Sequence, residues 1–419
     1  MSNKVSKKIK IAELFAGVGG FRIGLEEANR MLGSEQFQVV FSNQWEPGEK
    51  GQFASRVYVH RWGAEGHSND DISKVDASSL PAIDLLVGGF PCQDYSVARP
   101  LNQASGLVGK KGVLWWEIHR IASKKMPKFL LLENVDRLLS SPAGHRGRDF
   151  ALILSSLNDL GYAVEWRVIN AGEYGFPQRR KRTFILAYKA STKAAKLSAK
   201  DPSGWLKSTG TMSKAFPATF DEQKHEKTFN IVGDVYEISE NFNKSPKALT
   251  PFMNAGVCVG RVVHTAKATP STTNKGFTLG DVLIPESQVP SEYFISDDEL
   301  PKWKFQKGAK SLQRTKKNGI QYSYDEGSMA FPDHLDKPSR TIITGEGGKT
   351  PSRFKHVVKT PSGRFRRLTP VELERLNQFP DHHTKLDNIT DARRAFFMGN
   401  ALVTGVVTQI GLKLAELKD

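Results

Sequence analysis

The stretch Asp84-Leu-Leu-Val-Gly-Gly-Phe-Pro-Cys-Gln-Asp-Tyr-Ser-Val-Ala98 indicates both the fold of this chain and the place of its chemistry. An apolar run at 83–87 predicts a buried strand that ends at two glycines, after which the chain enters a loop at Pro91-Cys92-Gln93. In open α/β sheets, ligands bind at the carboxyl ends of the strands. Cys92 is one of only two cysteines in 419 residues. Its position makes it a candidate nucleophile, although a buried structural cysteine would fit this stretch alone as well.

The composition predicts a globular protein with a polyanionic partner. A hydrophobic content of 39% is enough to build a core, and a chain of 419 residues can hold two domains or one large domain with an insertion. Two cysteines exclude a disulfide framework, and no spacing of His and Cys indicates a metal site, so we expect no metal. The lysine-rich start is no signal peptide, and no apolar run of about 18 residues predicts a membrane span. Lys and Arg number 60 against 44 Asp and Glu, a net charge of +16, which favours nucleic acid as the partner.

Strands alternate with helices in the first part of the chain. Apolar runs predict strands at 10–15, 37–43, 83–90, 129–135, 163–169 and 183–188, and helical spacing predicts helices at 21–32, 113–122 and 149–160. This alternation predicts an α/β fold with a doubly wound, mostly parallel sheet covered on both faces.

The composition changes near residue 189. From there to about 364 the chain is rich in Lys, Ser, Thr, Gly and Pro, with short β-like runs at 229–238, 257–263, 341–344 and 354–358. A capping box at Thr369-Pro-Val-Glu372 starts a helix, and an apolar stripe predicts a final helix at 403–417 that returns to the first domain. We therefore predict a catalytic and cofactor-binding domain at 1–188, a smaller, irregular β-rich domain at 189–364, and a segment at 365–419 that completes the first domain.

A glycine turn follows the first strand. Gly17 and Gly19 fit a dinucleotide fingerprint, but Arg22 occupies the position of its third glycine, so a pyrophosphate is not specifically indicated. The turn still lets a ligand approach the backbone at a helix N-terminus. After the next strands, Gln44 or Glu46 can bind a ribose, Trp45 can stack on a base, and Asp71 can accept a hydrogen bond from an exocyclic amine. In this order, these residues suit an adenosine.

Charged residues stand at two further strand ends. Glu133 ends the apolar run 129–132, where a carboxylate is costly unless it is paired or functional. A surface salt bridge would explain it, and so would a carboxyl that protonates a ring nitrogen beside Cys92. Arg180 and Arg182 alternate on an extended segment, so we expect them to point the same way. Two such cations can lower the thiol pKa of Cys92 and hold a substrate oxygen.

Six motifs follow one another along the chain: Glu13-Leu-Phe-Ala-Gly-Val-Gly-Gly-Phe21, Phe90-Pro-Cys-Gln93, Glu133-Asn-Val135, Gln178-x-Arg180-x-Arg182, Arg367-Leu-Thr-Pro370 and Gly399-Asn400. Together and in this order, they closely resemble the bacterial DNA (cytosine-5)-methyltransferases of type II restriction-modification systems. The resemblance covers about 190 residues at the amino end and the last 55, and Thr341-Ile342 matches the family's short Thr-Leu/Ile marker in the variable region. It implies a Rossmann-like methyltransferase fold dependent on S-adenosylmethionine, in which 189–364 is the target-recognition domain that reads the DNA major groove.

The resemblance also implies roles for individual residues. Cys92 would add to C6 of a flipped-out cytosine, so that C5 can take the methyl group, and Glu133, supported by Arg180 and Arg182, would contact N3 and the exocyclic amine. The implied cofactor-binding residues are Phe15, Ala16, Gly17, Gly19, Gly20, Gln44, Trp45, Asp71, Ile72, Pro91, Asn400 and Ala401. The implied DNA or substrate contacts are Gln93, Ser96, Lys110, Lys111, Gln178 and Thr341, with the loop through Lys110 and Lys111 as a lid. The family usually has Glu at position 44 and Ser at position 401, so we expect an active enzyme with an adjusted cofactor site.

The resemblance further implies double-stranded DNA as substrate, a cognate restriction endonuclease as functional partner, and a monomeric, cytoplasmic, nucleoid-associated enzyme. A tRNA cytosine-5 methyltransferase of the same fold is the closest alternative, but the large basic insertion favours duplex DNA. A Rossmann oxidoreductase is disfavoured by Arg22 and by the Pro-Cys-Gln motif. A catalytically dead DNA-binding protein is disfavoured because every residue of the catalytic type is present.

Overall fold

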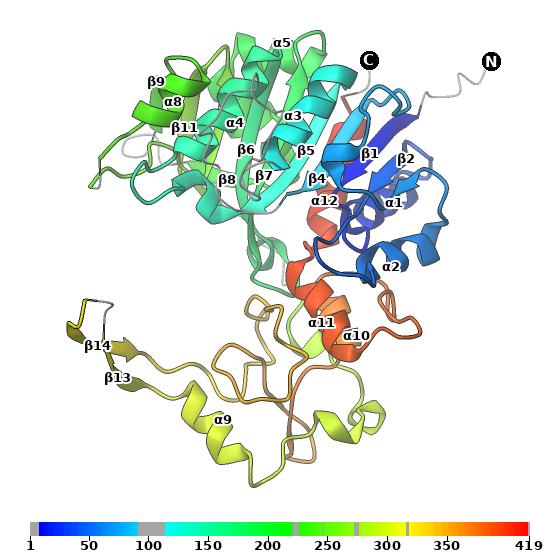
Figure 1. Cartoon of the computed structure of the whole chain (residues 1–419), viewed down its shortest axis with the longest axis vertical. Helices are drawn as coiled ribbons and strands as arrows, with labels where there is room; N and C mark the ends of the chain where they lie inside the picture. Colours follow the sequence, from blue (N-terminus) through cyan, green and yellow to red (C-terminus); the bar gives the residue numbers. More distant parts are fainter. Residues whose placement is uncertain are drawn as a thin grey trace. The chain divides into compact units, whose positions relative to one another are not determined.

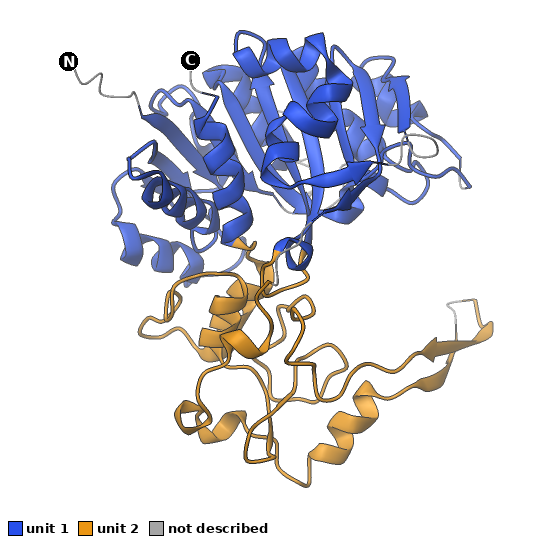
Figure 2. Cartoon of the chain, turned by 180° about the vertical axis from the view of Figure 1, so that it is seen from behind, with its two compact units in different colours: residues 1–174, 181–273, 404–419 blue, residues 175–180, 274–403 orange. Residues whose placement is uncertain are grey.

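The computed structural model describes residues 8–90, 114–220, 226–245, 247–271, 276–315 and 318–417. The chain divides into two compact units, shown in different colours in Figure 2. Unit 1 consists of residues 1–174, 181–273 and 404–419, and unit 2 of residues 175–180 and 274–403. These divisions fall at other positions than the predicted domains 1–188, 189–364 and 365–419, whose functional assignment stays a prediction.

Unit 1 is built on a ten-stranded sheet in the order β3-β2-β1-β4-β5-β7-β6-β10-β11-β9 (Figure 1). The pairings run parallel from β3 to β5 and antiparallel from β5 to β9, so that seven strands, β3, β2, β1, β4, β5, β6 and β11, share one direction. The strand bounds are β1 Ile9–Leu14, β2 Phe37–Asn43, β3 His67–Ser68, β4 Leu85–Gly89, β5 Phe129–Val135, β6 Tyr162–Asn170, β7 Lys181–Lys189, β9 Glu226–Asn230, β10 Ala255–Val259 and β11 Val262–Ala266. The predicted α/β class is confirmed.

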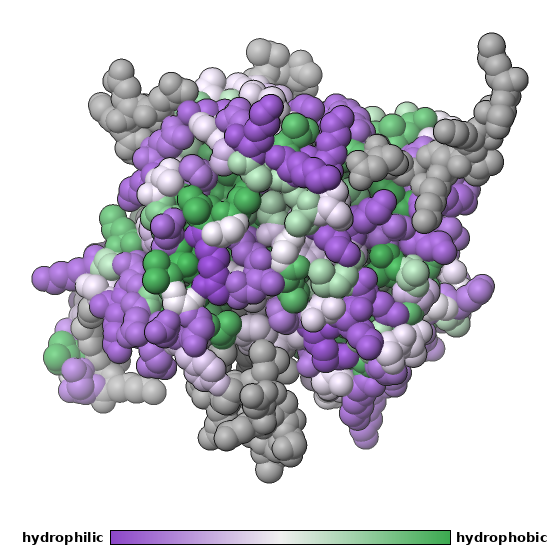
Figure 3. Space-filling model, turned by 90° about the horizontal axis from the view of Figure 1, so that it is seen from above, coloured by the Kyte–Doolittle hydropathy of each residue, from purple (hydrophilic) through white to green (hydrophobic). Residues whose placement is uncertain are grey.

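Both faces of this sheet are buried. Leu130 and Leu132 of β5 belong to one core cluster with α3 (Leu114–Lys125) and α4 (Arg148–Asp159), while Leu131 between them is fully buried on the other side. A strand buried on both faces needs a continuous apolar run, and the run at 129–132 supplies it. The further helices of unit 1 are α1 Gly20–Leu32, α2 Phe53–Trp62, α5 Lys193–Lys200, α6 Pro202–Gly204, α7 Thr211–Ala215, α8 Val235–Asn241 and α12 Thr404–Ala415. On the face that Figure 3 shows, hydrophilic residues surround scattered groups of hydrophobic ones.

The last helix returns to the first, as the sequence predicts. At Gly24 of α1, an added Cβ would stand 2.6 Å from Cβ of Val407 in α12, so only glycine permits this approach. Thr408 donates a hydrogen bond from its hydroxyl to the Gly24 carbonyl at 2.9 Å. Two helices almost 400 residues apart in the sequence therefore pack in one core.

Several expectations for the middle of the chain are wrong. The run at 229–238 is not one strand: β9 ends at Asn230, and Asp234 forms the capping box of α8. The run at 257–263 is the hairpin β10–β11, which turns at Gly260 and Arg261, and β9, β10 and β11 extend the sheet of unit 1. No strand forms at 341–344, and the run at 354–358 contributes only the start of β15. The helix predicted from Asp149 begins one residue earlier, at Arg148, with Gly147 as its cap.

Unit 2 carries little regular structure in its described residues. It contains the two-stranded sheets β13–β14 (Lys310–Thr315 and Gln321–Glu326) and β15–β16 (Val358–Lys359 and Phe365–Arg366), and the helices α9 Leu300–Lys307, α10 Pro370–Leu376 and α11 Asp391–Asn400. The predicted capping box of Thr369 and Glu372 is present at the start of α10. Two short strands of unit 1, β8 Ala218–Phe220 and β12 Ala268–Pro270, form a separate pair. Over the described residues, no single helix passes the length and hydropathy test for a membrane span; the bent pair α11 and α12 passes it jointly.

Candidate active site

The carboxyl ends of β1, β4 and β5 meet at one edge of the unit 1 sheet. These strands are parallel neighbours, with Leu14 of β1 level with Gly88 of β4, and Gly89 level with Glu133 of β5. The glycine turn, the start of the Phe90-Pro91-Cys92 segment and the Glu133 carboxyl therefore leave the sheet side by side. This is the edge at which such sheets bind their ligands.

Glu133 is held by an arginine from the next strand. Arg182 lies in β7, opposite Val135, and its Nε stands 2.9 Å from Oε1 of Glu133. The two side chains are only 12% and 18% exposed, so the pair is partly shielded from water and fixes the direction of the carboxyl. A Cβ at Gly89 would stand 3.1 Å from Oε2 of Glu133. The carboxyl thus lies over Gly89, the last residue of β4, and Gly89 precedes Cys92 by three residues in the sequence.

Asn134 ties this carboxyl to the segment that carries the cysteine. Its buried Nδ2 donates to the Phe90 carbonyl at 3.0 Å, which links the end of β5 to the last described residue before Pro91. Sequence reasoning included Asn134 only as part of a motif and gave it no role. A buried amide next to a functional acid is the signal that could have found it.

The glycine turn after β1 is shaped for close approach. Phe15, Gly17 and Gly19 all have positive φ, which places three backbone bends within five residues. The Gly17 amide donates to Oε1 of Gln44 at 2.7 Å. At Gly19 a Cβ would meet the Trp62 ring at 2.2 Å, so a side chain has no room there. The side-chain oxygen of Gln44 is therefore used by the turn. Its side-chain NH2 group is the part that can donate a hydrogen bond to a ligand.

A buried acid that the sequence analysis did not single out supports the turn. Glu13, in β1, is fully buried and accepts a hydrogen bond from the Tyr58 hydroxyl at 2.9 Å and from the Arg22 amide at 3.4 Å. Burial raises the pKa of its carboxyl to about 7, against the opposing effect of the Tyr58 hydrogen bond. The Arg22 guanidinium in turn lies 4.8 Å above the Trp62 ring. The signal in the sequence that could have identified Glu13 is a charged residue within an apolar strand.

The residues predicted to bind an adenosine follow neighbouring strands. Trp45, after β2, is 37% exposed, and Asp71 and Ile72 follow β3, which pairs with β2. The Asp71 carboxylate caps a short 3-10 helix by accepting from the Ser73 amide at 3.0 Å. Glu46 accepts from the Ala54 amide at 3.0 Å, in the first turn of α2. The structure therefore brings Phe15, Gln44, Trp45 and Asp71 to one edge of unit 1, and their contact with a cofactor stays a prediction.

Other predicted residues bond within unit 2. Gln178 is fully buried: its Nε2 donates to Oδ1 of Asn377 at 2.8 Å, and its Oε1 accepts from the Ile342 amide at 3.0 Å. Arg180 is buried and donates to the Gly399 carbonyl at 2.8 Å, and Thr341 donates to the Arg179 carbonyl at 2.6 Å. These bonds tie the segment 175–180 to the rest of unit 2.

Asn400 ends α11 with an exposed side chain, and the Ala401 amide donates to the Phe397 carbonyl at 2.8 Å. Arg180 lies outside β7 and belongs to unit 2, whereas Arg182 belongs to unit 1. That the two arginines point the same way therefore stays a prediction, as do the substrate contacts of Gln178 and Thr341.

Six predicted residues lie outside the described part of the chain: Pro91, Cys92, Gln93, Ser96, Lys110 and Lys111. The second cysteine, however, is described. Cys258 is fully buried in β10, its thiol contacts Oδ1 of Asn158 at 3.3 Å, and burial raises its pKa to about 12. A thiol of this kind is inert as a nucleophile.

Two polar features of unit 2 are structural. Ser339, His356 and Glu346 form a hydrogen-bonded chain, with 3.0 Å from Ser339 Oγ to Nε2 and 2.9 Å from Nδ1 to Glu346. All three are buried, and the Ser339 hydroxyl donates to the Arg340 carbonyl, so these three residues offer no accessible nucleophile.

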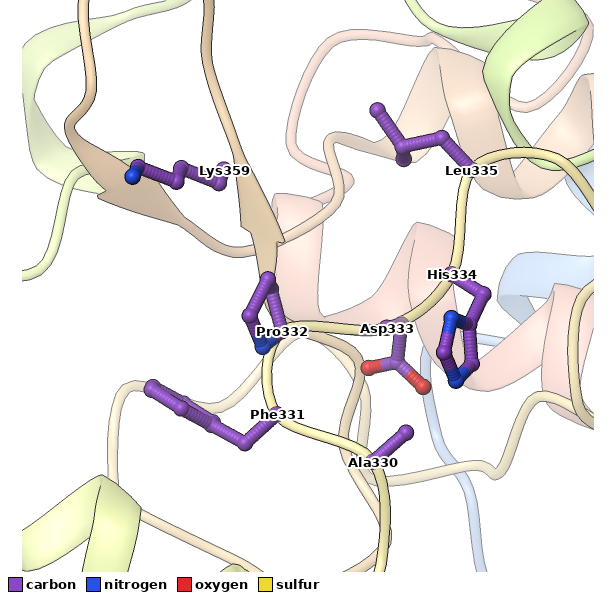
Figure 4. A pocket seen from close by; sticks show the side chains of 7 residues that line it. All are labelled: Ala330, Phe331, Pro332, Asp333, His334, Leu335 and Lys359. Atoms are coloured by element: carbon purple, nitrogen blue, oxygen red, sulfur yellow. The ribbon is translucent and has the colours of Figure 1, made fainter.

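A concavity of about 380 Å³ is lined by Lys359 and by residues 330–335 (Figure 4). The carboxylate of Asp333 in its lining accepts hydrogen bonds from the Arg340 side chain and the Val357 amide. Over the described residues, no group of three His, Cys, Asp or Glu side chains could hold a metal ion.

Comparison with known proteins decides the family. The model of the C-5 cytosine-specific DNA methylases matches residues 9–416. The chain belongs to this family. This DNA methylase is 42% identical over 414 residues to the type II methyltransferase M.Sau3AI of Staphylococcus aureus, covering 98% of the chain and 96% of that relative. It is 37% identical over 186 residues to M1.ScrFI of Lactococcus lactis subsp. cremoris, covering 44% of the chain and 43% of that protein.

The fold of the methylase is also found in solved structures. The Dnmt2 methyltransferase of S. pombe aligns over 99% of this chain and 100% of its own, with a TM-score of 0.57 and 16% identity. A Dnmt2 mutant of Spodoptera frugiperda aligns over 96% and 98%, with a TM-score of 0.58 and 13% identity. At such identities the likeness shows the fold alone. The predicted family, fold and DNA (cytosine-5)-methyltransferase activity are confirmed, and methyltransferases of this kind use S-adenosylmethionine.

Proposed function

We propose that this methylase modifies cytosine within a specific duplex sequence through the Cys92 thiol, with S-adenosylmethionine bound at the glycine turn. The observation that carries the proposal is the Glu133–Arg182 pair at the carboxyl end of β5, where Glu133 is level with Gly89, the residue three positions before Cys92 in the sequence. The buried state of Cys258 supports it, because Cys92 is the other of the two cysteines in the chain.

The chain's own groups divide the reaction between them. The Cys92 thiolate would form a bond to C6 of the cytosine, which moves electron density to C5. Glu133, oriented by Arg182, would present its carboxyl to N3 and the exocyclic amine and so stabilise the adduct. After methyl transfer, a base would remove the C5 proton, and the bond from C6 to sulfur would break to release Cys92. Asn134 would hold the segment entering the Cys92 loop through the Phe90 carbonyl.

The edge of the sheet fits an adenosyl cofactor. The positive-φ turn at Gly17 and Gly19 leaves no side chain between a ligand and the start of α1, and Trp45 offers a partly exposed ring for an adenine. Gln44 would donate to a ribose hydroxyl through its NH2 group, since its oxygen is used by Gly17. When bound, S-adenosylmethionine supplies the methyl group. Contacts from Ala16, Gly20, Ile72, Pro91, Asn400 and Ala401 belong to the same proposal.

The biological setting belongs to the proposal as well. M.Sau3AI and M1.ScrFI are named type II methyltransferases, which supports a role as the protective half of a restriction-modification system. An endonuclease gene beside the gene for this chain, and resistance of its host DNA to that endonuclease, would test this. Sedimentation tests the expected monomer, and imaging of a tagged chain tests a cytoplasmic, nucleoid-associated location.

The central test is covalent trapping. A duplex library containing 5-fluorocytosine is incubated with the enzyme and S-adenosylmethionine; fluorine at C5 blocks the release step, so the enzyme should stay attached to DNA. Cys92→Ser should abolish the adduct, and Cys258→Ser, the matched control, should keep it. An adduct with tRNA and none with duplex DNA would overturn the proposal in favour of an RNA substrate. An adduct that survives Cys92→Ser would overturn the assignment of the nucleophile.

A further inference from the structure

Unit 2 extends a two-stranded ribbon that packs against little else. β13 and β14 pair antiparallel from Lys310 opposite Glu326 to Thr315 opposite Gln321, and Figures 1 and 2 both show this hairpin reaching away from the rest of unit 2. Isolated two-stranded hairpins are marginal in water. Contacts between side chains of the two strands must therefore stabilise this ribbon, and its exposed surface is a candidate binding surface.

One face of the ribbon supplies that support. The Arg314 guanidinium lies 3.8 Å above the Tyr324 ring, and Leu312 is half-buried opposite Tyr324. At the base, Glu326 pairs with Lys310 and with Arg353, each at 3.3 Å. These contacts hold the ribbon in shape without using its other face.

The other face, which we call the polar face, consists of Ser311, Gln313, Thr315, Gln321, Ser323 and Asp325, as the register dictates. All six are exposed. Ser311, Ser323 and Asp325 bond one another near the base. Gln313, Thr315 and Gln321 make no side-chain hydrogen bond within the described part of the chain, so their donors and acceptors are available to a partner.

The dimensions of this ribbon fit duplex DNA. A two-stranded ribbon fits the major groove, where base edges show a distinct pattern of donors and acceptors. Residues two apart on a strand stand roughly 7 Å apart, so Gln313 and Thr315 span about two base-pair steps. Among the charged side chains of the ribbon, Glu326 is neutralised by its ion pairs with Lys310 and Arg353, and the exposed Arg314 of the supporting face balances the exposed Asp325 of the polar face.

We propose that the polar face enters the major groove of the target duplex and that Gln313 and Gln321 read base edges there. The proposal rests on the proposed sequence-specific methylation and assigns a source for the specificity. A glutamine amide presents one donor and one acceptor, which match N6 and N7 of adenine. The recognition sequence should therefore contain an A·T pair that each glutamine reads.

The test is the methylation pattern of a host that lacks cytosine-5 methylation. The full chain is expressed, and its sites are mapped by bisulfite sequencing of the host genome. Wild type should methylate one short motif. Gln313→Ala and Gln321→Ala should each relax one position of that motif, lowering the preference for the correct base about 10-fold or more, while the other positions hold. Tyr324→Phe, on the supporting face, should leave the motif unchanged.

Each outcome bears on the proposal. A motif unchanged in both glutamine variants overturns it, and a wild type that methylates no cytosine overturns the proposed function with it. If a glutamine variant is inactive in the host, its binding to a duplex that carries the wild-type motif and to a scrambled duplex is compared by gel-shift competition. If binding to the motif falls to the level of the scrambled duplex, base reading is supported. If binding to both duplexes falls equally, the proposal is overturned.

Discussion

Replacing Glu13 by Gln should change how the stability of this methylase depends on pH. The carboxyl is fully buried and its pKa rises to about 7, from an ordinary value of 4.5, because burial disfavours the charge. Between these two pH values the folded state binds more protons than the unfolded state, so stability falls as pH rises and the loss is complete above pH 7. The loss is about 3.5 kcal/mol at most, because a difference of about 2.5 between the two pKa values is worth about 1.4 kcal/mol for each unit.

Urea unfolding of both proteins from pH 5 to pH 8 measures this effect. Glutamine mimics the protonated carboxyl, and the Tyr58 hydroxyl can rotate to serve either partner. We expect the free energy of unfolding of Glu13→Gln to gain about 2 to 3 kcal/mol on wild type between pH 5 and pH 8. Burial raises the pKa of the Glu165 carboxyl to about 7 as well. Glu165 is present in both proteins, so its contribution cancels when the free energy of unfolding of wild type is subtracted from that of the variant. Glu26→Gln, an exposed neighbour that bonds Arg22, is the matched control.

A constant difference between Glu13→Gln and wild type across this range would refute the reasoning. It would mean that Glu13 stays ionised in the folded protein at pH 5, with the Tyr58 and Arg22 contacts outweighing burial.

Three further changes test the site. Arg182→Met should lower the single-turnover rate of methyl transfer about 100-fold with little change in DNA affinity, because the Glu133 carboxyl loses its orientation, and Arg182→Lys should recover part of it; an unchanged rate would contradict the role. Gly19→Ala should lower the free energy of unfolding by about 2 to 4 kcal/mol, since its Cβ would meet the Trp62 ring at 2.2 Å, whereas Gly17→Ala, with open space around it, should cost about 1 kcal/mol in the same urea titration. Gln178→Ala should lower the free energy of unfolding by about 3 kcal/mol, because the Ile342 amide and the Asn377 side chain lose a buried partner; a fully stable variant would show that water replaces the glutamine.

Much of unit 1 could be predicted because its signals are local. β2 and β5 have the predicted bounds, since an apolar run between turns marks both ends of a buried strand. The placement of β9, β10 and β11 in the same sheet could not be predicted in this way. The pairing of β10 with β6 attaches these three strands to the sheet and joins residues about ninety positions apart in the chain, as in Ala255 opposite Arg167, and composition does not encode such partners.

The candidate site shows the same division. Glu133 was found because a charge at the end of an apolar run stands out, and its Arg182 partner follows from the pairing of β5 with β7. Glu13 presents the same signal, but its role depends on Tyr58 and the Arg22 amide, which lie outside its own apolar run and cannot be read from it. Gln178 was predicted from its motif as a substrate contact, yet its amide is used inside unit 2. A motif identifies which residue matters and leaves open which neighbour it bonds.

The contact of α1 with α12 has a consequence for how this protein is made. Residues 20–32 leave the ribosome early, yet the helix that covers Gly24 and Leu25 is synthesised almost 400 residues later. Both stretches of unit 2 are complete by residue 403, before α12 exists. We expect the nascent chain to finish unit 2 first and to leave the apolar side of α1 uncovered until α12 has been made, so the slow step of folding is the closure of the loop of almost 400 residues between the two helices.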